Sequence, residues 1–226
     1  MGQTIALTAS DGHTFSAYEA SPKGKHRGGL VVIQEAFGVN EHVRAVTDGF
    51  AAEGYYCISP ALFDREKPGM ELGYGPEVFA VVRPLMDKIG MDNMLLDVEA
   101  ARAAAASAGK VGVVGYCLGG SLSWLAATRL HGFAAASCYY GGRIAANAGE
   151  KPHCPVQMHF GENDQGISMA DVEKIRANVP SRLVEIFVYP APAGHGFNRD
   201  VTAAYEPDAA KLARERTLKL FREHVG

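Results

Sequence analysis

Short apolar runs alternate with helix-like segments along most of the chain, and this alternation limits the folds that are open to it. Helices are expected at residues 41–53, 95–108, 119–130, 168–178 and 208–224. Strands that are buried on both faces of a parallel sheet form compact apolar runs. The chain has six: "LVVI" (30–33), "YYCIS" (55–59), "VGVV" (111–114), "FAAASCYY" (133–140), "VQMHF" (156–160) and "VEIFVY" (184–189). The alternation predicts a mostly parallel, doubly wound α/β sheet with helices on both faces.

Capping residues mark the ends of two of these helices. Asn40 precedes the first helix and Gly54 follows it, as an N-cap and a C′ glycine do. Ser168 and Asp171 have the spacing of a capping box, which predicts that a helix begins there. Residues 64–75, "DREKPGMELGYG", are expected instead to form a long surface loop that serves as the lid or wall of a site.

The N-terminal segment differs from the rest of the chain. The runs "TIALT" and "HTFSAYEA" flank Ser10-Asp11-Gly12, and Asp-Gly supplies the positive φ angles that a two-residue hairpin turn needs. We therefore expect an antiparallel hairpin ahead of the parallel sheet. The chain has 226 residues, 47% of them hydrophobic, and no internal repeat or linker, so it fits one domain over residues 1–226.

Charge and cysteine content argue against several classes of protein. The chain has 22 Lys and Arg against 25 Asp and Glu, a net charge of −3, and no basic run suited to nucleic acid. Its four cysteines form no CxxC pair, which argues against a zinc cage or a disulfide framework. No apolar run approaches the roughly 20 residues of a membrane helix. We expect a cytoplasmic, monomeric protein without metal or cofactor that acts on a small molecule.

Cys117 lies in "VGVVGYCLGGSL", between an expected strand and an expected helix. A nucleophile elbow needs its residue at such a turn, with small residues two positions to either side, and Gly115 and Gly119 supply them. The N-terminus of the following helix would direct its dipole and free N–H groups at the sulfur. The stretch therefore predicts a reactive cysteine.

The same stretch permits a second interpretation, a buried structural thiol in a glycine-rich turn. Two other functions of its glycines do not fit, because the spacing is not GxGxxG and no Lys-Ser or Lys-Thr pair of a P-loop follows. Taken alone, the stretch leaves both interpretations of Cys117 open.

An elbow hydrolase also needs an acid and then a histidine, each on a loop after a later strand. Asp164 follows the run "VQMHF", and His195 follows "VEIFVY" between two glycines, so the order matches. Glu162 is the alternative acid, but it follows Gly161 closely and is expected to point off the strand end. His159 lies within a strand, so packing accounts for it better than metal binding.

Taken together, these motifs resemble the dienelactone hydrolase (carboxymethylenebutenolidase) family, which has the α/β-hydrolase fold. The stretches that carry the resemblance span nearly the whole chain in the family's order. They are "DGHTF" (11–15), "QEAFGVN" (34–40), "GKVGVVGYCLGG" (109–120), "YYGG" (139–142), "GENDQ" (161–165) and "AGHGFNR" (193–199).

The resemblance implies a role for each matching residue. Cys117, His195 and Asp164 would form a catalytic triad, with the backbone N–H groups of Leu118 and Ala36 as the oxyanion hole. It also implies that Glu35 holds the thiol in the resting state and is displaced when substrate arrives. The residues themselves favour a role for Glu35, because a carboxylate at the end of a buried strand needs a partner or a catalytic task.

The resemblance also implies groups that bind the substrate. Arg199 matches a family arginine that binds a substrate carboxylate, which a guanidinium can do bidentately, and Phe37 is expected to line the pocket. The family's prototypes have a second anchoring arginine in the helical segment after the long loop. Here Arg83 is the sole arginine of that segment and lies about one helical turn late, with Phe79 or Ala80 nearer the expected place. The pocket is therefore expected to accept esters or lactones other than dienelactone.

The prediction is a cysteine hydrolase of small, anionic esters or lactones that takes part in the degradation of aromatic compounds. A glutamine amidotransferase would need a His-x-Glu pair, and His195-Gly196-Phe197 has none. The remaining alternative is a noncatalytic or thiol-sensing protein of the same fold, in which Cys117 responds to oxidants.

Overall fold

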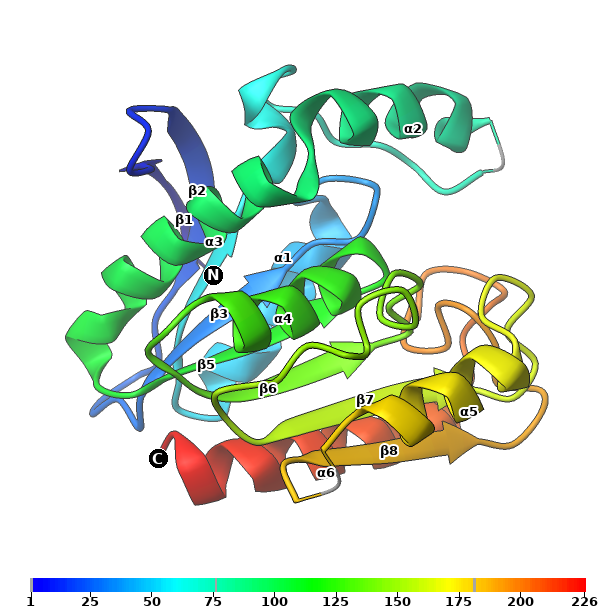
Figure 1. The fold of residues 1–226 in the computed structure, drawn as a ribbon. Coiled ribbons are helices and arrows are strands. Elements are labelled where there is room, and N and C mark those ends of the chain that lie inside the picture. The colour runs from blue at the N-terminus through cyan, green and yellow to red at the C-terminus, as the bar shows by residue number, and fades with distance from the viewer. Residues whose placement is uncertain (1, 76, 181) are drawn as a thin grey trace.

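The computed structural model describes residues 2–75, 77–180 and 182–226, which contain one sheet of eight strands (Figure 1). The strand order is β1-β2-β4-β3-β5-β6-β7-β8. β2 pairs antiparallel with β1 and β4, and every other pair in the sheet is parallel. The predicted N-terminal hairpin and mostly parallel sheet are confirmed. The strands are β1 (Gln3–Thr8), β2 (Thr14–Ala20), β3 (Gly29–Ile33), β4 (Tyr56–Pro60), β5 (Val111–Tyr116), β6 (Phe133–Tyr139), β7 (Val156–Gly161) and β8 (Val184–Tyr189).

Helices cover both faces of the sheet, as expected for a doubly wound fold. α1 and α6 lie on one face, where the rings of Phe50 and Phe221 pack edge to face 6.1 Å apart, and α3, α4 and α5 lie on the other (Figure 1). α2 lies beyond the edge of this layer. The α-helices are α1 (Glu41–Ala52), α2 (Val78–Ile89), α3 (Met91–Ala105), α4 (Leu118–Arg129), α5 (Met169–Asn178) and α6 (Pro207–His224), with short 3-10 turns η1 (Leu62–Arg65) and η2 (Ala106–Ala108).

The predicted helix ends are correct where a capping residue marked them. The Asn40 side chain accepts a hydrogen bond from Val43 N, and Ser168 and Asp171 form the expected capping box. The helix expected at 95–108 is wrong at its start, because α3 already begins at Met91, whereas its last turn is the 3-10 turn η2, which ends at Ala108 as predicted. The loop expected at 64–75 is shorter than predicted, since its first two residues belong to η1.

The hairpin turn between β1 and β2 also differs from the prediction. Ala9 N donates to His13 O, so the loop contains three residues, 10–12, instead of two. Gly12 has a φ of +87°, and Asp11 is not in the left-handed region. This is the three-residue class of hairpin, in which one glycine after a tight turn restores the strand direction.

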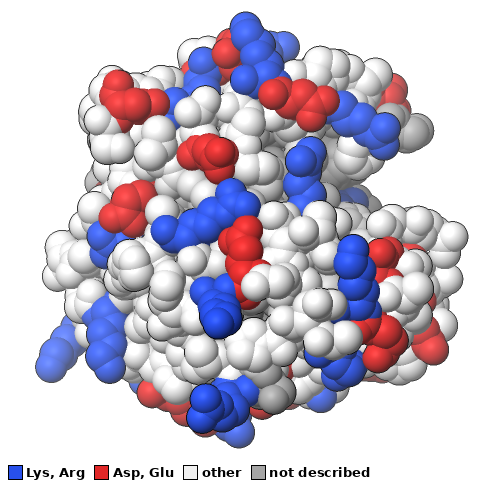
Figure 2. Space-filling view, in the orientation of Figure 1, with Lys and Arg blue, Asp and Glu red and all other residues white. Residues whose placement is uncertain are grey.

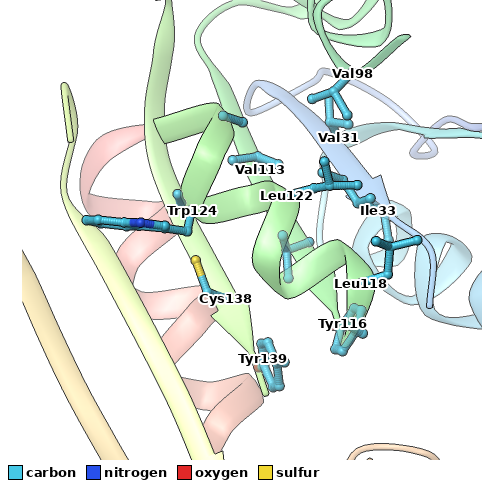
Figure 3. Close-up of a cluster of buried hydrophobic side chains, with 14 of the residues drawn as sticks. Val31, Ile33, Val98, Val113, Tyr116, Leu118, Leu122, Trp124, Cys138 and Tyr139 are labelled. Carbon is cyan, nitrogen blue, oxygen red and sulfur yellow. The ribbon is translucent and has the colours of Figure 1, made fainter. Parts of the chain in front are cut away.

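The main core lies between the sheet and the helices α3 and α4 (Figure 3). Val31 and Ile33 from β3, Val113 from β5 and Leu122 from α4 meet there and are fully buried. α4 is buried around its whole circumference from Leu118 to Thr128. The residue that precedes α4 is therefore held by a rigid element.

The strand order places a crevice at the ends of β3 and β5. After β3 the chain crosses to β4 on one side, and it later returns to β5 on the other side of β3. Ligands of open α/β sheets bind where the order reverses in this way, at the carboxyl ends of the strands. Glu35 and Ala36 follow β3, and Cys117 follows β5, so this crevice holds residues that the sequence singled out.

Candidate active site

Cys117 occupies the sharp turn between β5 and α4. Its backbone has a φ of +56° and a ψ of −108°, a strained conformation for a residue with a side chain. Cys117 N donates to Tyr139 O at 3.0 Å, which ties the turn to the neighbouring strand β6. Cys117 is also the N-cap of α4, so the positive end of the helix dipole lies beside its sulfur.

The glycines around Cys117 are required by close backbone packing. A Cβ atom at Gly119 would overlap the carbonyl oxygen of Ile33, and one at Gly120 would overlap that of Tyr139. The first turn of α4 therefore lies directly against the ends of β3 and β6. The spacing GxCxGG exists because no larger residue fits between these strands.

Cys117 is also distinguished from the other cysteines by its exposure. Cys57, Cys138 and Cys154 are buried, whereas Cys117 is partly exposed. Burial raises the pKa of the thiols of Cys57, Cys138 and Cys154, which keeps them protonated. Of the four cysteines, Cys117 has the exposure that a reactive thiol needs.

Asp164 and His195 lie together, although 31 residues separate them. His195 Nδ1 is 2.9 Å from Asp164 Oδ2, and the Asp164 side chain is fully buried. Its other oxygen accepts hydrogen bonds from Gly166 N at 2.7 Å and Ile167 N at 3.0 Å, which fix the carboxylate. Glu162, the alternative acid, is exposed and accepts instead from Ala191 N.

The imidazole of His195 favours its protonated form. Burial of the ring opposes protonation, but hydrogen bonds to Asp164 and Cys117 and the charges of both groups outweigh it and raise the pKa to about 10. The ring of Tyr140 lies 5.1 Å from that of His195 and limits its movement. An imidazolium held in this position stabilises negative charge on the Cys117 sulfur.

Glu35 and Arg199 form a second buried pair of side chains, joined by an ion pair. Arg199 Nε is 2.8 Å from Glu35 Oε2, and Arg199 Nη2 is 3.2 Å from Oε1, a bidentate contact. Burial lowers the pKa of Arg199, but the charge of Glu35 and its hydrogen bonds outweigh this, so the net shift is upward. In this structure Glu35 pairs with Arg199, and no hydrogen bond joins it to Cys117 within the described residues.

Aromatic rings enclose the Arg199 guanidinium. Its central carbon is 5.1 Å from the centroid of the Phe37 ring and 4.9 Å from that of Tyr74. The Tyr74 hydroxyl in turn accepts from Asn40 Nδ2 at 3.1 Å. Phe37 is buried behind the pocket wall, in edge contact with Phe79. Tyr74 thus brings the long loop into contact with Arg199, but the described residues of that loop do not border the pocket beside Cys117.

Cys117 and His195 border a pocket of about 410 Å³ beneath α2. Leu118 and Ala36 border it too, and neither backbone N–H donates to a protein acceptor in residues 2–75, 77–180 and 182–226. Leu118 begins α4, so its N–H has no acceptor within the helix. Two unsatisfied donors beside a thiol match what a developing oxyanion requires.

α2 contributes one face to this pocket. Phe79, Arg83, Met86 and Asp87 border it, at the spacing of residues on one side of a helix. The sequence had pointed to Arg83 and to the position of Phe79, which both belong to the segment after the long loop. Sequence reasoning missed the remaining lining residues, which are Met86, Asp87, Ser121, Gly142 and Arg143.

Arg143 could have been found by the rule that identified Asp164 and His195. It follows β6, the strand next to β5, and lies on a loop at the same sheet edge. His159 lies inside β7 with Nδ1 2.8 Å from the Tyr189 hydroxyl, and burial lowers its pKa to about 3. It is a neutral, hydrogen-bonded core residue, as expected.

The described residues contain neither a metal-binding cluster nor a membrane-spanning helix. No group of three or more His, Cys, Asp or Glu side chains is placed to hold a metal ion in residues 2–75, 77–180 and 182–226. Across that same part of the chain, no helix has the length and apolarity needed to cross a bilayer.

Comparison with known sequences gives one family. The sequence profile of the dienelactone hydrolase family matches residues 15–225. A candidate carboxymethylenebutenolidase from Synechocystis is 37% identical over 213 residues, which cover 87% of this chain and 86% of the relative. The carboxymethylenebutenolidase of Pseudomonas putida is 31% identical over 222 residues, which cover 95% of this chain and 93% of the relative.

Solved structures agree with the fold. A candidate dienelactone hydrolase from Klebsiella pneumoniae superposes with a TM-score of 0.83 at 30% identity, over 98% of this chain and 100% of that one. An esterase from Pyrococcus furiosus superposes with a TM-score of 0.72 at 12% identity, over 100% of this chain and 93% of that one. The predicted α/β-hydrolase fold is confirmed.

Proposed function

The chain belongs to the dienelactone hydrolase family, and from this premise we propose that it hydrolyses small carboxylic esters or lactones through a thioester on Cys117. The observation that carries the proposal is the alignment of three groups at one sheet edge. A partly exposed cysteine caps the start of a buried helix and borders the pocket. A histidine borders the same pocket, and a buried aspartate lies 2.9 Å from that histidine.

The first half of the proposed reaction forms the thioester. The Cys117 thiolate attacks the carbonyl carbon, a C–S bond forms, and the carbonyl π electrons move to oxygen. The N–H groups of Leu118 and Ala36 stabilise this oxyanion, and losing one such donor typically costs about 100- to 1,000-fold in rate. When the C–O bond breaks, His195 protonates the leaving oxygen. In a lactone the leaving group stays attached to the acyl chain.

The second half releases the product. A water molecule attacks the thioester carbonyl while neutral His195 takes one of its protons. Collapse of the second tetrahedral intermediate breaks the C–S bond and releases the carboxylic acid. This step restores the thiolate of Cys117 and the imidazolium of His195. Asp164 orients the histidine through both halves and stabilises its charged form.

Glu35 and Arg199 are proposed to control access to this chemistry. We propose that Glu35 holds the Cys117 thiol before substrate binds. When substrate displaces Glu35, the thiol proton passes to His195, which gives the thiolate and imidazolium of the first half, and Glu35 pairs with Arg199 as in this structure. Arg83, which borders the pocket, is a proposed substrate-binding residue. Phe37 does not border that pocket and would act only by supporting Phe79, which does.

The test is the Cys117→Ala variant with 4-nitrophenyl acetate and dienelactone as substrates. We expect hydrolysis to fall to the background rate, while circular dichroism and the unfolding midpoint stay close to those of the wild type. Cys57→Ala is the matched control for removing a thiol, and it should keep its activity. Turnover by folded Cys117→Ala protein would contradict the proposal.

A wild-type protein that forms a sulfenic acid at Cys117 but hydrolyses neither substrate would favour the thiol-sensing alternative. The unpaired thiols suit a reducing compartment, and we propose that the protein works in the cytoplasm.

A further inference from the structure

Arg143 is fixed by its backbone beside the nucleophile. Its N–H donates to Ser121 Oγ at 3.1 Å, and Ser121 lies in the first turn of α4. Two residues earlier, a Cβ atom at Gly141 would come within 2.7 Å of Ser121 N, so this loop packs directly on the helix that Cys117 begins. The Cα atom of Arg143 is therefore held at a set distance from the pocket.

The Arg143 side chain, by contrast, has weak partners. Its exposed fraction is 54%, and its carboxylate contact within the described residues is Asp87 Oδ1, 3.8 Å from Nη2. Asp87 is itself 75% exposed, so water screens this pair strongly. Arg199 differs, because its charge is already neutralised by the buried carboxylate of Glu35.

The pocket itself is electropositive. Arg83 and Arg143 bring two positive charges to its lining and Asp87 one negative charge. The space-filling view shows the molecule hollowed on the side beneath α2, with basic side chains at the surface nearby (Figure 2). A carboxylate that entered here would meet a cation with a loosely held partner, at much lower cost than breaking the pair of Glu35 and Arg199.

We infer that Arg143 binds the carboxylate of an anionic ester or lactone and that Asp87 occupies Arg143 until that substrate arrives. The inference rests on the proposed function and names the substrate class and the residue that selects it. Arg143 is a specificity residue: it contacts the end of the substrate remote from the reacting carbonyl. Bidentate recognition suits a guanidinium better than an ammonium group, so lysine should replace it only in part.

Two matched substrates test the inference. In 4-nitrophenyl hydrogen adipate the acyl chain ends in a carboxylate, whereas in 4-nitrophenyl hexanoate a methyl group replaces that carboxylate. Steady-state kinetics with both esters would be measured for the wild type, Arg143→Gln, Arg143→Lys and Asp87→Asn. Arg176→Gln removes the same charge from an exposed position at the last turn of α5, and it serves as the control.

For Arg143→Gln we expect KM for the adipate ester to rise about tenfold, since the guanidinium is half exposed, and KM for the hexanoate ester to stay unchanged. Arg143→Lys should lie between Arg143→Gln and the wild type. Asp87→Asn removes the competing carboxylate, so KM for the adipate ester should fall about twofold. Arg176→Gln should match the wild type with both esters. Equal changes for the two esters in Arg143→Gln would overturn the inference, as would an unchanged adipate KM in both Arg143→Lys and Asp87→Asn.

A binding measurement separates this inference from the proposed reaction. Calorimetric titration of Cys117→Ala protein with monomethyl adipate and with methyl hexanoate needs no turnover. We expect the charged ester to bind more tightly, and the additional Arg143→Gln substitution to remove that difference. If the wild type hydrolyses neither nitrophenyl ester but this difference is present, the proposed reaction fails and the anion site stands. If hydrolysis occurs and binding is independent of Arg143, the anion site fails alone.

Discussion

The guanidinium of Arg199 holds the carboxylate of Glu35 by two contacts, Nε to Oε2 at 2.8 Å and Nη2 to Oε1 at 3.2 Å. Both side chains are almost completely buried, and 164 residues separate them. The pair joins the segment after β3 to the segment after β8. One bond therefore fixes two of the loops from which the site is built.

Removing one partner of this pair should lower the free energy of unfolding more than removing both partners. Arg199→Met leaves the Glu35 carboxylate buried without a partner, and we expect the free energy of unfolding to fall by about 3–5 kcal/mol. The double variant Glu35→Leu/Arg199→Met removes both charges and should lose less than the two single variants lose together. Urea denaturation of all four proteins gives the coupling energy. Strictly additive losses would contradict a direct pair.

The protonated His195 should make stability depend on pH in the alkaline range. Its pKa is raised from 6.5 to about 10, so its contribution is fully present below pH 6.5 and is lost as the pH rises through about 10. The free energy of unfolding of the wild type should therefore fall between pH 7 and 10, relative to that of His195→Gln. Denaturation curves at pH 6, 8 and 10 measure this difference. Parallel curves for the two proteins would show that the histidine pKa is not raised.

Asp164→Asn should leave the fold in place and disable the histidine. The amide keeps an oxygen for the N–H groups of Gly166 and Ile167 but no longer offers a charge to His195 Nδ1. By analogy with an aspartate-to-asparagine change in a serine triad, we expect kcat to fall by about 10⁴-fold. A titration of the His195 ring followed by NMR should show a lower pKa than in the wild type. Glu162→Gln, at the neighbouring exposed carboxylate, is the control and should remain active.

Adding one methyl group to the turn should disturb the site strongly. Gly119→Ala places a Cβ atom against the carbonyl oxygens of Ile33 and Gln34, which belong to backbone and cannot rotate away. Overpacking of this kind costs about 1–3 kcal/mol, and it should also displace Cys117 and reduce hydrolysis. Gly149→Ala is the matched control, because nothing lies within 4 Å of its added Cβ atom. Equal unfolding midpoints for the two variants would contradict the close packing.

Two adjacent tyrosines should respond differently to loss of the hydroxyl. The Tyr139 hydroxyl lies 2.8 Å from Thr217 Oγ1, whereas the buried Tyr140 hydroxyl has no hydrogen-bond partner among the described residues. Tyr139→Phe should lower the free energy of unfolding by about 1 kcal/mol, and Tyr140→Phe should leave it unchanged or raise it. Thermal unfolding of the two variants under the same conditions compares them directly. A larger loss for Tyr140→Phe would reveal a partner for its hydroxyl.

The sequence predicts most of the sheet because buried parallel strands form apolar runs that polar loops interrupt. It also predicts that Asp164 and His195 meet, since each follows such a run and the carboxyl ends of parallel strands share one edge. The start of α3 was missed because Asp92 and Asn93 look like loop residues, although they lie on the outer side of the helix.

The sequence did not predict which side chains of distant loops would pair. Glu35 and Arg199 were each assigned a separate partner, the thiol and the substrate, and their bond depends on how two loops 164 residues apart pack together. No periodic pattern or motif marked Arg143 in the sequence, and the one indication was that it follows a strand. Its place in the pocket depends on the packing of its loop against Ser121.

The position of α2 has a consequence for how such an enzyme could change. Phe79, Arg83, Met86 and Asp87 come from a single helix at the margin of the structure, whereas Cys117, Asp164 and His195 stand on the edge of the sheet. Those four residues thus lie in one short stretch of sequence, apart from the proposed reacting groups. Substitutions within residues 77–90 can therefore alter one wall of the pocket while Cys117, Asp164 and His195 keep their places.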